Sequence, residues 1–304
     1  MRISTSWSQQ LAVDAMLNQQ VKLSDAQLKL SSGQKYLKPS ENPTAVTGLI
    51  NLQQNIKENE QYQVNIGMAR QRLGLQESSL SNATETLQRI RELAVQGLND
   101  SNNADNRNQI AVEIDELNKH LLSIANTQNA NGEYLFSGTK SDVPAYSLGA
   151  GGYSFDGEPD SQRSIAIGPD RTVTDGDPGN SVFGELTPGA LTAGSIGNVF
   201  QAVAQLSLDL KNNQPSSSSL TDLDDALKRF ETTRASTGAR LHALDNQENI
   251  NDDYILDNKA TASAIGDLDY ADAISKFNLQ QTSLQAAQQA YIKVQNLSLF
   301  NYIN

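Results

Sequence analysis

A long helical repeat occupies the first third of the chain. Positions at alternating steps of three and four are mostly apolar and run without a break through Leu52, Asn55, Asn59, Tyr62, Ile66, Ala69, Leu73, Gln76, Leu80, Ala83, Leu87, Ile90, Ala94 and Gly97. This spacing is typical of the a and d positions of a coiled coil. At 1.5 Å per residue it predicts a helix roughly 70 Å long.

Three later segments repeat the pattern. They run through Ile110, Ile114, Leu117, Leu121 and Ile124, then through Ile196, Val199, Val203, Leu206 and Leu210, and finally through Leu223, Leu227, Phe230, Arg234, Thr237, Leu241, Leu244, Glu248, Asn251, Ile255, Asn258, Ala262 and Ile265. The last segment matches the first in length, so we expect these two helices to lie antiparallel, with the shorter ones packed against them. Polar residues in the repeats, such as Gln76 and Asn251, favour a specific assembly, because buried amides cost stability but fix the register.

A segment of different composition interrupts the helices. Residues 132–189 hold 11 of the 20 glycines and five of the eight prolines. Turn-forming pairs such as Asp156-Gly157 separate short strand-like runs at 153–155 and 163–167, which predicts a compact β-rich insert. The expected fold is therefore mainly α, a long antiparallel coiled-coil helical rod with a β-rich inserted outer domain. We expect an N-terminal assembly helix at 1–40, the ascending rod at 41–131, the insert at 132–189, the returning rod at 190–265 and a C-terminal assembly helix at 266–304.

The two ends carry helical stripes of their own. One stripe contains Met16, Gln19, Leu23, Ala26 and Leu30, and the other contains Tyr270, Ala273, Phe277, Gln280, Leu284, Ala287, Tyr291 and Val294. The last 30 residues hold six glutamines and no acidic residue. Such a helix suits packing between copies of the chain, the alternative being that it docks on its own monomer. The residues we expect at subunit contacts are Leu23, Leu30, Phe277, Leu284, Ala287, Tyr291, Val294, Leu297 and Phe300.

Charge and composition narrow the functional classes. The net charge is −12, and residues 51–274 carry −16 while the segments on either side are each +2. This balance argues against nucleic acid as a partner, and no apolar stretch is long enough to span a membrane. The start of the chain lacks the apolar region of a cleaved secretory signal. The chain has no cysteine, which excludes disulfides and thiolate chemistry.

No motif indicates catalysis or a bound cofactor. The segment from Asp175 to Asn180 alternates oxygen side chains like a calcium loop, but the twelfth position is Leu186 where a glutamate is needed. We interpret it as a glycine-rich turn. His120 and His242 lie on predicted helices without the spacing of a zinc site, and no G-x-S-x-G elbow occurs. We therefore expect no enzyme activity, no cofactor and no metal.

Four segments resemble the flagellin superfamily. They are MRIST at the start, SSGQKYLKPSENPTAV at 31–46, ANGEYLFSGTK at 130–140 and LQAAQQAYIKVQNLSLFNYI at 284–303. The resemblance covers roughly residues 1–140 and 195–304 and is silent over the insert. Filament-forming flagellins typically continue their SSG segment into DDAAG, whereas this chain has Pro39-Ser40-Glu41-Asn42-Pro43. That loop is similar to the PSDDP pattern of the superfamily's hook–filament junction members.

Two details of these motifs have a structural interpretation. Ser40 can cap a helix whose first turn contains Pro43, and the Glu41-Asn42 pair retains capping capacity. In the segment containing Tyr134, Leu135 and Phe136 are expected to seat the insert on the rod.

The resemblance implies a structural role in the extracellular flagellum. It implies export without a cleaved signal through the flagellar type III channel, with a chaperone on the C-terminal segment before secretion. It further implies self-association in a helical ring, with a hook-associated protein on the hook side and flagellin on the other. The alternatives are a filament-forming flagellin, or a secreted effector or adhesin that uses exposed Tyr146, Tyr153 and Phe155 of the insert.

Overall fold

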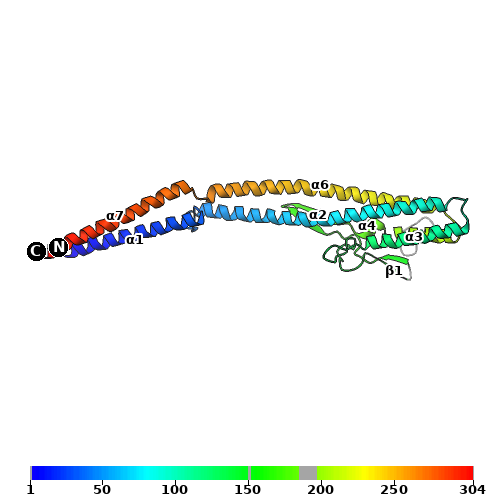
Figure 1. The fold of residues 1–304 in the computed structure, drawn as a ribbon, viewed down its shortest axis with the longest axis horizontal. Helices are drawn as coiled ribbons and strands as arrows, with labels where there is room; N and C mark the ends of the chain where they lie inside the picture. Colours follow the sequence, from blue (N-terminus) through cyan, green and yellow to red (C-terminus); the bar gives the residue numbers. More distant parts are fainter. Residues whose placement is uncertain (1, 150–151, 185–196, 304) are drawn as a thin grey trace. The chain divides into compact units, whose positions relative to one another are not determined.

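The computed structural model describes residues 2–149, 152–184 and 197–303, and the side chains of 7, 9–149, 152–184 and 197–293. The fold is mainly α (Figure 1). The helices are α1 (Arg2–Ser32), α2 (Pro43–Gly97), α3 (Ala104–Ala125), α4 (Gly179–Phe183), α5 (Val199–Lys211), α6 (Ser218–Gly266) and α7 (Tyr270–Ile303). The strands are β1 (Tyr146–Gly149), β2 (Gly152–Phe155), β3 (Ser164–Gly168) and β4 (Arg171–Thr174).

Contacts divide the chain into two compact units. One comprises Met1–Glu58 with Asp253–Asn304, and the other comprises Asn59–Asp252. The long helices α2 and α6 contribute residues to both units, so each unit contains segments from both halves of the sequence.

In the unit of residues 59–252, α2 and α6 lie side by side and antiparallel (Figure 1). Arg91 Nε donates to Asp224 Oδ1 at 2.6 Å, Arg70 Nη2 donates to Asp245 Oδ1 at 2.8 Å and Gln63 Nε2 donates to Asp252 Oδ1 at 2.6 Å. As the residue number on α2 falls from 91 to 63, the residue number of the hydrogen-bond partner on α6 rises from 224 to 252. The antiparallel pairing of the two long helices expected from the sequence is therefore confirmed.

The predicted seam of α2 is buried along most of its length. Every seam position from Ile66 to Gly97 is buried, whereas Leu52, Asn59 and Tyr62 are only partly covered and Asn55 is exposed. On α6 the buried positions are Ser219, Leu223, Ala226, Phe230, Thr237, Leu244, Gln247 and Asn251. The shorter helices α3 and α5 complete this core, and Asn103 and Asn198 cap their N-termini. Of the expected α5 pattern, Ile196 lies outside the described residues.

The predicted insert forms two antiparallel hairpins. β1 pairs with β2, with Tyr146 opposite Phe155, and β3 pairs with β4, with Ser164 opposite Thr174. The runs expected at 153–155 and 163–167 are thus strands within one residue of their predicted bounds. Two-stranded sheets are marginal alone. The hairpins pack their buried residues into the same apolar clusters as the helices.

The aromatic residues of the insert are not an exposed binding surface. Tyr146 is 1% exposed and Tyr153 is 9% exposed, while Phe155 is half-buried with its ring 5.3 Å from that of Tyr146. Tyr146 and Tyr153 also contact Phe200 on α5 at 4.8 and 5.6 Å. The possibility of an adhesin that binds through exposed Tyr146 and Tyr153 is therefore wrong, because these rings fill the space between the first hairpin and α5.

Candidate assembly surface

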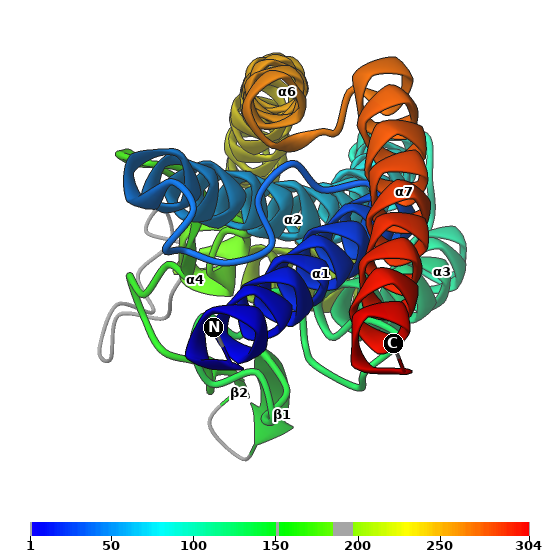
Figure 2. The same cartoon turned by 90° about the vertical axis from the view of Figure 1, so that its left-hand side faces the viewer.

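The helices α1 and α7 form an antiparallel pair within the unit of the chain ends (Figure 2). The residues predicted for subunit contacts, Leu23, Leu30, Phe277, Leu284, Ala287 and Tyr291, are all partly buried. Gln19 Nε2 lies 3.5 Å from the backbone oxygen of Gln280, which links the two stripes. The stripes therefore cover each other within one chain. Val294, Leu297 and Phe300 lie outside the residues whose side chains are described.

A second set of apolar residues lies on the side of α1 opposite its stripe, and one of them, Val21, borders a cavity that α7 also lines. Trp7, Leu11, Val21 and Leu28 are each more than half exposed, and Trp7, the single tryptophan of the chain, is 69% exposed. Val21 and Leu28 lie two positions before Leu23 and Leu30, about 200° around the helix. Asp14, Asn18 and Asp25 interrupt their three-and-four spacing, and the sequence analysis missed this face for that reason. Exposed large apolar residues that gather on one side of a helix indicate a protein contact site.

The helix α7 also exposes apolar residues and has little charge. Leu279 is 66% exposed and Ile292 is 56% exposed. No charged residue occurs between Lys276 and Lys293. A groove of about 380 Å³ runs between the two helices, and its apolar lining includes Met16, Leu17, Leu284 and Ile292. A surface of this kind can meet another neutral apolar helix without desolvating paired charges.

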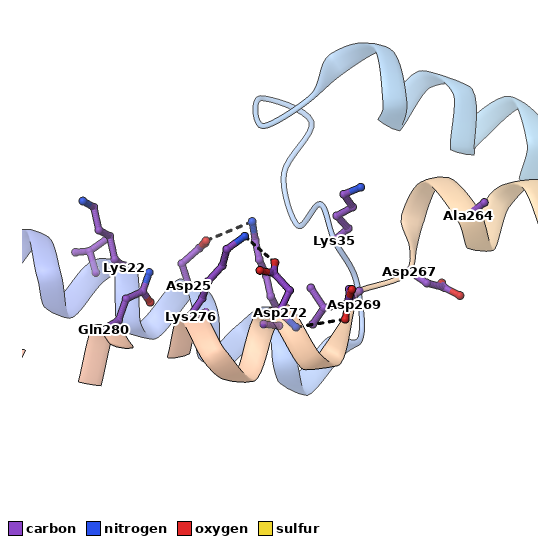
Figure 3. Close-up of a pocket in the computed structure, with 14 residues that line it drawn as sticks. Lys22, Asp25, Lys35, Ala264, Asp267, Asp269, Asp272, Lys276 and Gln280 are labelled. Atoms are coloured by element: carbon purple, nitrogen blue, oxygen red, sulfur yellow. Dashed lines mark hydrogen bonds and ion pairs between the residues drawn. The ribbon is translucent and has the colours of Figure 1, made fainter. Parts of the chain in front are cut away.

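Nearer the turns between helices, the same pair borders a larger cavity of about 720 Å³ (Figure 3). Its charged lining contains both signs and consists of Lys22, Asp25, Lys29, Lys35, Asp267, Asp269, Asp272 and Lys276. Lys276 binds Asp272 one turn away at 2.6 Å, and the Asp269 side chain caps the start of α7. These charges mostly serve local helix contacts, so the cavity lacks the single sign of charge that an ionic ligand would require.

An ion pair ties the end of α1 to the loop that follows it. Lys29 Nζ lies 2.5 Å from Glu41 Oε2 and 3.6 Å from Asp25 Oδ2. The hydrogen bond from Lys29 lowers the pKa of the Glu41 carboxyl, and the same bond raises the pKa of the Lys29 ammonium. Both side chains are 24% exposed at the surface, so solvent weakens the pair and it steadies the loop more than it stabilises the fold.

The motif loop starts α2, but through a different cap from the one predicted. Pro43 is the first residue of α2, as expected. Asn42 is the cap, because its Oδ1 accepts the backbone N–H of Ala45 at 3.1 Å and its carbonyl accepts that of Val46. Ser40 is exposed in the preceding turn, as is Pro39. The expectation that Ser40 caps the helix is wrong, because the cap must directly precede the first helical residue.

The second motif segment lies in the core of the other unit. Leu135 and Phe136 are buried, and the Phe136 ring meets that of Phe183 edge-on at 5.2 Å. Tyr134 is half-buried, and its carbonyl accepts a hydrogen bond from Arg72 Nη2 at 3.3 Å. Arg72 of α2 also donates to the carbonyl of Leu135 at 3.2 Å. The segment is thus bound to α2 through its backbone and to α4 through the Phe136 ring.

The glycine-rich turn after β4 docks between α2 and α6. Arg240 holds the Asp177 carboxylate with two hydrogen bonds of 2.9 and 2.8 Å, and Gln76 Nε2 donates to the same group at 2.7 Å. The buried Asp175 pairs with Arg163 at 2.5 Å. These carboxylates are engaged by cations of the chain itself. Within the described residues, no group of three or more histidine, cysteine or acidic side chains has the arrangement of a metal site.

The two histidines lie on helices, as the sequence predicts. His120 and His242 are both exposed on their helices. In the part of the chain that is described, no helix has the length and apolar character that crossing a membrane requires.

Comparison with known proteins identifies relatives over the full length of the chain. Residues 3–141 match the family described as the bacterial flagellin N-terminal helical region. The chain is 29% identical to flagellar hook-associated protein 3 of Escherichia coli K12 and 28% identical to that of Salmonella typhimurium LT2, over 99% of each chain in both cases. A flagellin of Listeria innocua is 29% identical over 70% of this chain and 69% of its own.

Solved structures share the fold. A putative flagellar hook-associated protein from Vibrio parahaemolyticus superposes with a TM-score of 0.66 at 24% identity, over 75% of this chain and 100% of that one. Flagellar hook-associated protein 3 from Legionella pneumophila gives a TM-score of 0.62 at 24% identity, over 70% and 98%. The resemblance found in the terminal motifs is confirmed: the first part of the chain matches the flagellin N-terminal helical region, and the chain is similar over its full length to flagellar hook-associated protein 3.

Proposed function

We propose that this chain is a structural junction protein of the bacterial flagellum, which connects hook-side proteins to the flagellin filament. The observation that supports this role is the share of the chain over which each relative is similar. It extends over 99% of the chain for hook-associated protein 3 but over only 70% for the Listeria flagellin. The PSENP loop, which departs from the DDAAG of filament-forming flagellins, favours the same assignment.

In this proposal the paired terminal helices assemble with copies of the chain in a helical ring. The apolar face of Trp7, Leu11, Val21 and Leu28 supplies one contact surface, and the neutral groove beside Leu284 supplies the other. Two different surfaces make a head-to-tail contact, and repetition of such a contact generates rings or helices. We also expect Val294, Leu297 and Phe300 to take part in the subunit contacts.

The ring has a different neighbour on each side. A hook-associated protein lies on the hook side and flagellin lies on the filament side. Contacts with these neighbours must outcompete contacts that would continue the chain's own lattice, so specificity is a difference between affinities. The protein works outside the cell without catalysis. It reaches that place without a cleaved signal, with an export chaperone on the C-terminal segment beforehand.

Removal of the gene tests the junction role. We expect the mutant to make hooks without filaments and to release unpolymerised flagellin into the medium. Electron microscopy of cells and immunoblots of the medium measure both outcomes, and a plasmid copy of the gene should restore filaments. Normal filaments on the mutant would contradict the proposal.

Polymerisation of the purified protein is the second test of the junction role. A junction protein should stay monomeric or form short oligomers under conditions in which flagellin from the same cells polymerises. Long filaments of this chain alone would instead favour the flagellin alternative.

A further inference from the structure

The two breaks between long helices lie against each other. On one side, α1 ends at Ser32 and α2 begins at Pro43, and on the other, α6 ends at Gly266 and α7 begins at Tyr270. The Lys35 N–H donates to the Gly266 carbonyl at 2.8 Å, and the Leu268 N–H donates to the Gly33 carbonyl at 2.9 Å. These reciprocal bonds form a short antiparallel bridge, with Gln34 opposite Asp267. We call residues 33–35 with 266–268 the break bridge.

The break bridge depends on close approach at Gly33. Its φ of +70° favours glycine, and a Cβ at this position would lie 2.9 Å from the Tyr270 hydroxyl oxygen. Gly266 is also crowded, because a Cβ there would lie 3.1 Å from the side chain of Leu49. The backbones of the two breaks are therefore held at one shared point by residues without side chains.

Packing around this point is thin. Among the described side chains, none between residues 7 and 55 or between 252 and 293 is fully buried. Cavities of about 720 and 540 Å³ border the break bridge, and Asp267 lines both of them. The first lies against α1 and α7 (Figure 3), and the second lies against the adjoining ends of α2 and α6. Little apolar contact is lost when helices tilt at such a place.

We propose that the break bridge is a pivot about which α1 and α7 swing as one body relative to the adjoining ends of α2 and α6. Both breaks bend at the same pair of hydrogen bonds, so one terminal helix cannot turn without the other. The mutual stripes of α1 and α7 keep the pair together during the motion. Hinges of this kind confine their backbone changes to a few residues at the ends of elements.

Spin labels at four exposed positions test the pivot in the monomeric full-length chain. The chain has no cysteine, so each double variant carries two labels only. Lys22→Cys with Asp257→Cys and Asn278→Cys with Thr47→Cys measure distances across the break bridge. Two control variants pair the same positions so that both labels lie on one side of the break bridge. They are Lys22→Cys with Asn278→Cys, and Thr47→Cys with Asp257→Cys.

Double electron–electron resonance then gives a distance distribution for each pair. We expect both distributions across the break bridge to be at least about twofold wider than both control distributions, as a collective hinge motion requires. Equal widths in all four variants would overturn the pivot. A wide distribution between positions 22 and 278 would overturn the motion as one body. The readout is within one chain and is therefore independent of the proposed junction role.

Two glycine variants test whether the break bridge couples the helices. Gly33→Ala introduces a side chain against Tyr270 in a left-handed conformation, whereas Gly48→Ala meets nothing within 4 Å. We expect Gly33→Ala to widen the distribution between positions 22 and 278 and Gly48→Ala to leave it unchanged. Equal distributions in the two glycine variants would overturn the coupling by the break bridge.

Discussion

Gln76 illustrates how a single polar residue is accommodated inside an apolar seam. Its Nε2 donates to Asp177 Oδ2 at 2.7 Å and to Thr237 Oγ1 at 3.1 Å, and its Oε1 accepts the backbone N–H of Asp177 at 3.1 Å. One buried amide thus joins α2, α6 and the turn after β4. Asn251 does the same for the second hairpin, because its Nδ2 donates to the Ile167 carbonyl at 2.9 Å. The sequence analysis expected these amides to specify an assembly. In the structure they bind the hairpin and turn of their own chain.

Replacement of Asp177 by alanine should therefore weaken the whole 59–252 unit. The change leaves the Arg240 guanidinium without its carboxylate and removes an acceptor from Gln76. Loss of one partner of a buried pair costs about 3 kcal/mol of unfolding free energy. Urea unfolding followed by circular dichroism measures it. Asp142→Ala, at an exposed position of the insert, is the control. An unchanged midpoint for Asp177→Ala would show that this turn does not brace the helices.

The Lys29–Glu41 contact predicts a defined pH dependence for the first loop. The lowered pKa of Glu41 contributes stability above the unfolded glutamate pKa near 4.3, and this contribution is lost as pH falls through the folded value. The raised pKa of Lys29 contributes below the unfolded lysine pKa near 10.4, and this is lost as pH rises through its folded value. Lys29→Met should raise the Glu41 pKa in an NMR titration. The same Glu41 pKa in both proteins would contradict the contact.

At the scale of elements, periodicity predicted the helices and failed on half of the strands. The stripes of the long helices extend over many turns, and each turn repeats the same signal. The strands β1 and β4 are four residues long and have one buried residue each, too few to show an alternation. The strand β2 is equally short, and it was predicted from its aromatic residues beside a turn-forming pair. The short helix α4 was missed for the same reason as β1 and β4. Its Val182 and Phe183 are buried by residues distant in sequence.

The apolar face of α1 predicts an assembly defect without a stability defect. Val21→Asp and Leu28→Asp place a carboxylate on the exposed face, so unfolding of the monomer should stay within about 0.5 kcal/mol of the parent. A carboxylate buried between copies lacks a partner, and each such variant should abolish filament attachment in a complementation assay. Gln27→Asp, at an exposed polar position of the same helix, should complement normally. Full complementation by Val21→Asp would exclude this face from the assembly.

At the scale of the whole molecule, burial differs between the two units. Ile56 is the first fully buried apolar side chain among those described, and the last is Leu244. Nearly all of the core therefore belongs to residues 59–252. Local opening should be easiest in the terminal helices, because few buried contacts oppose it. The sequence analysis expected the C-terminal segment to pack between copies because it lacks acidic residues, but it could not show that the two end helices cover each other.

Limited trypsin digestion of the dilute monomer should report this difference. We expect early cuts in the terminal helices at Lys22, Lys29, Lys276 and Lys293. A resistant product near residues 59–252 should follow, and mass spectrometry of the fragments identifies it. Cleavage inside α3 or α5 as fast as at Lys22 would contradict the assignment of the stable core.

Motif resemblance and geometry contributed different parts of the candidate site. The PSENP loop and the GEYLF segment indicated the family from the sequence alone. The exposed face of Trp7, Val21 and Leu28 became visible only when α7 was seen to cover the opposite side of α1. A helix with two apolar stripes gives no sequence signal for which one is buried within the chain, because that depends on where its partner packs.

The antiparallel course of α2 and α6 sets an order in which the chain can fold. Ile66, Ala69 and Leu73 are covered by Ile167, Val173 and Leu244. Arg70 meets a partner 175 residues further along. During synthesis from the N-terminus the cover of this stretch of α2 stays incomplete until Leu244 is added, when more than three quarters of the polypeptide exists. Contacts of such long separation form late, and an uncovered apolar stripe invites aggregation in the meantime. A ribosome that stalls before α6 would therefore release an incomplete chain that is prone to aggregation.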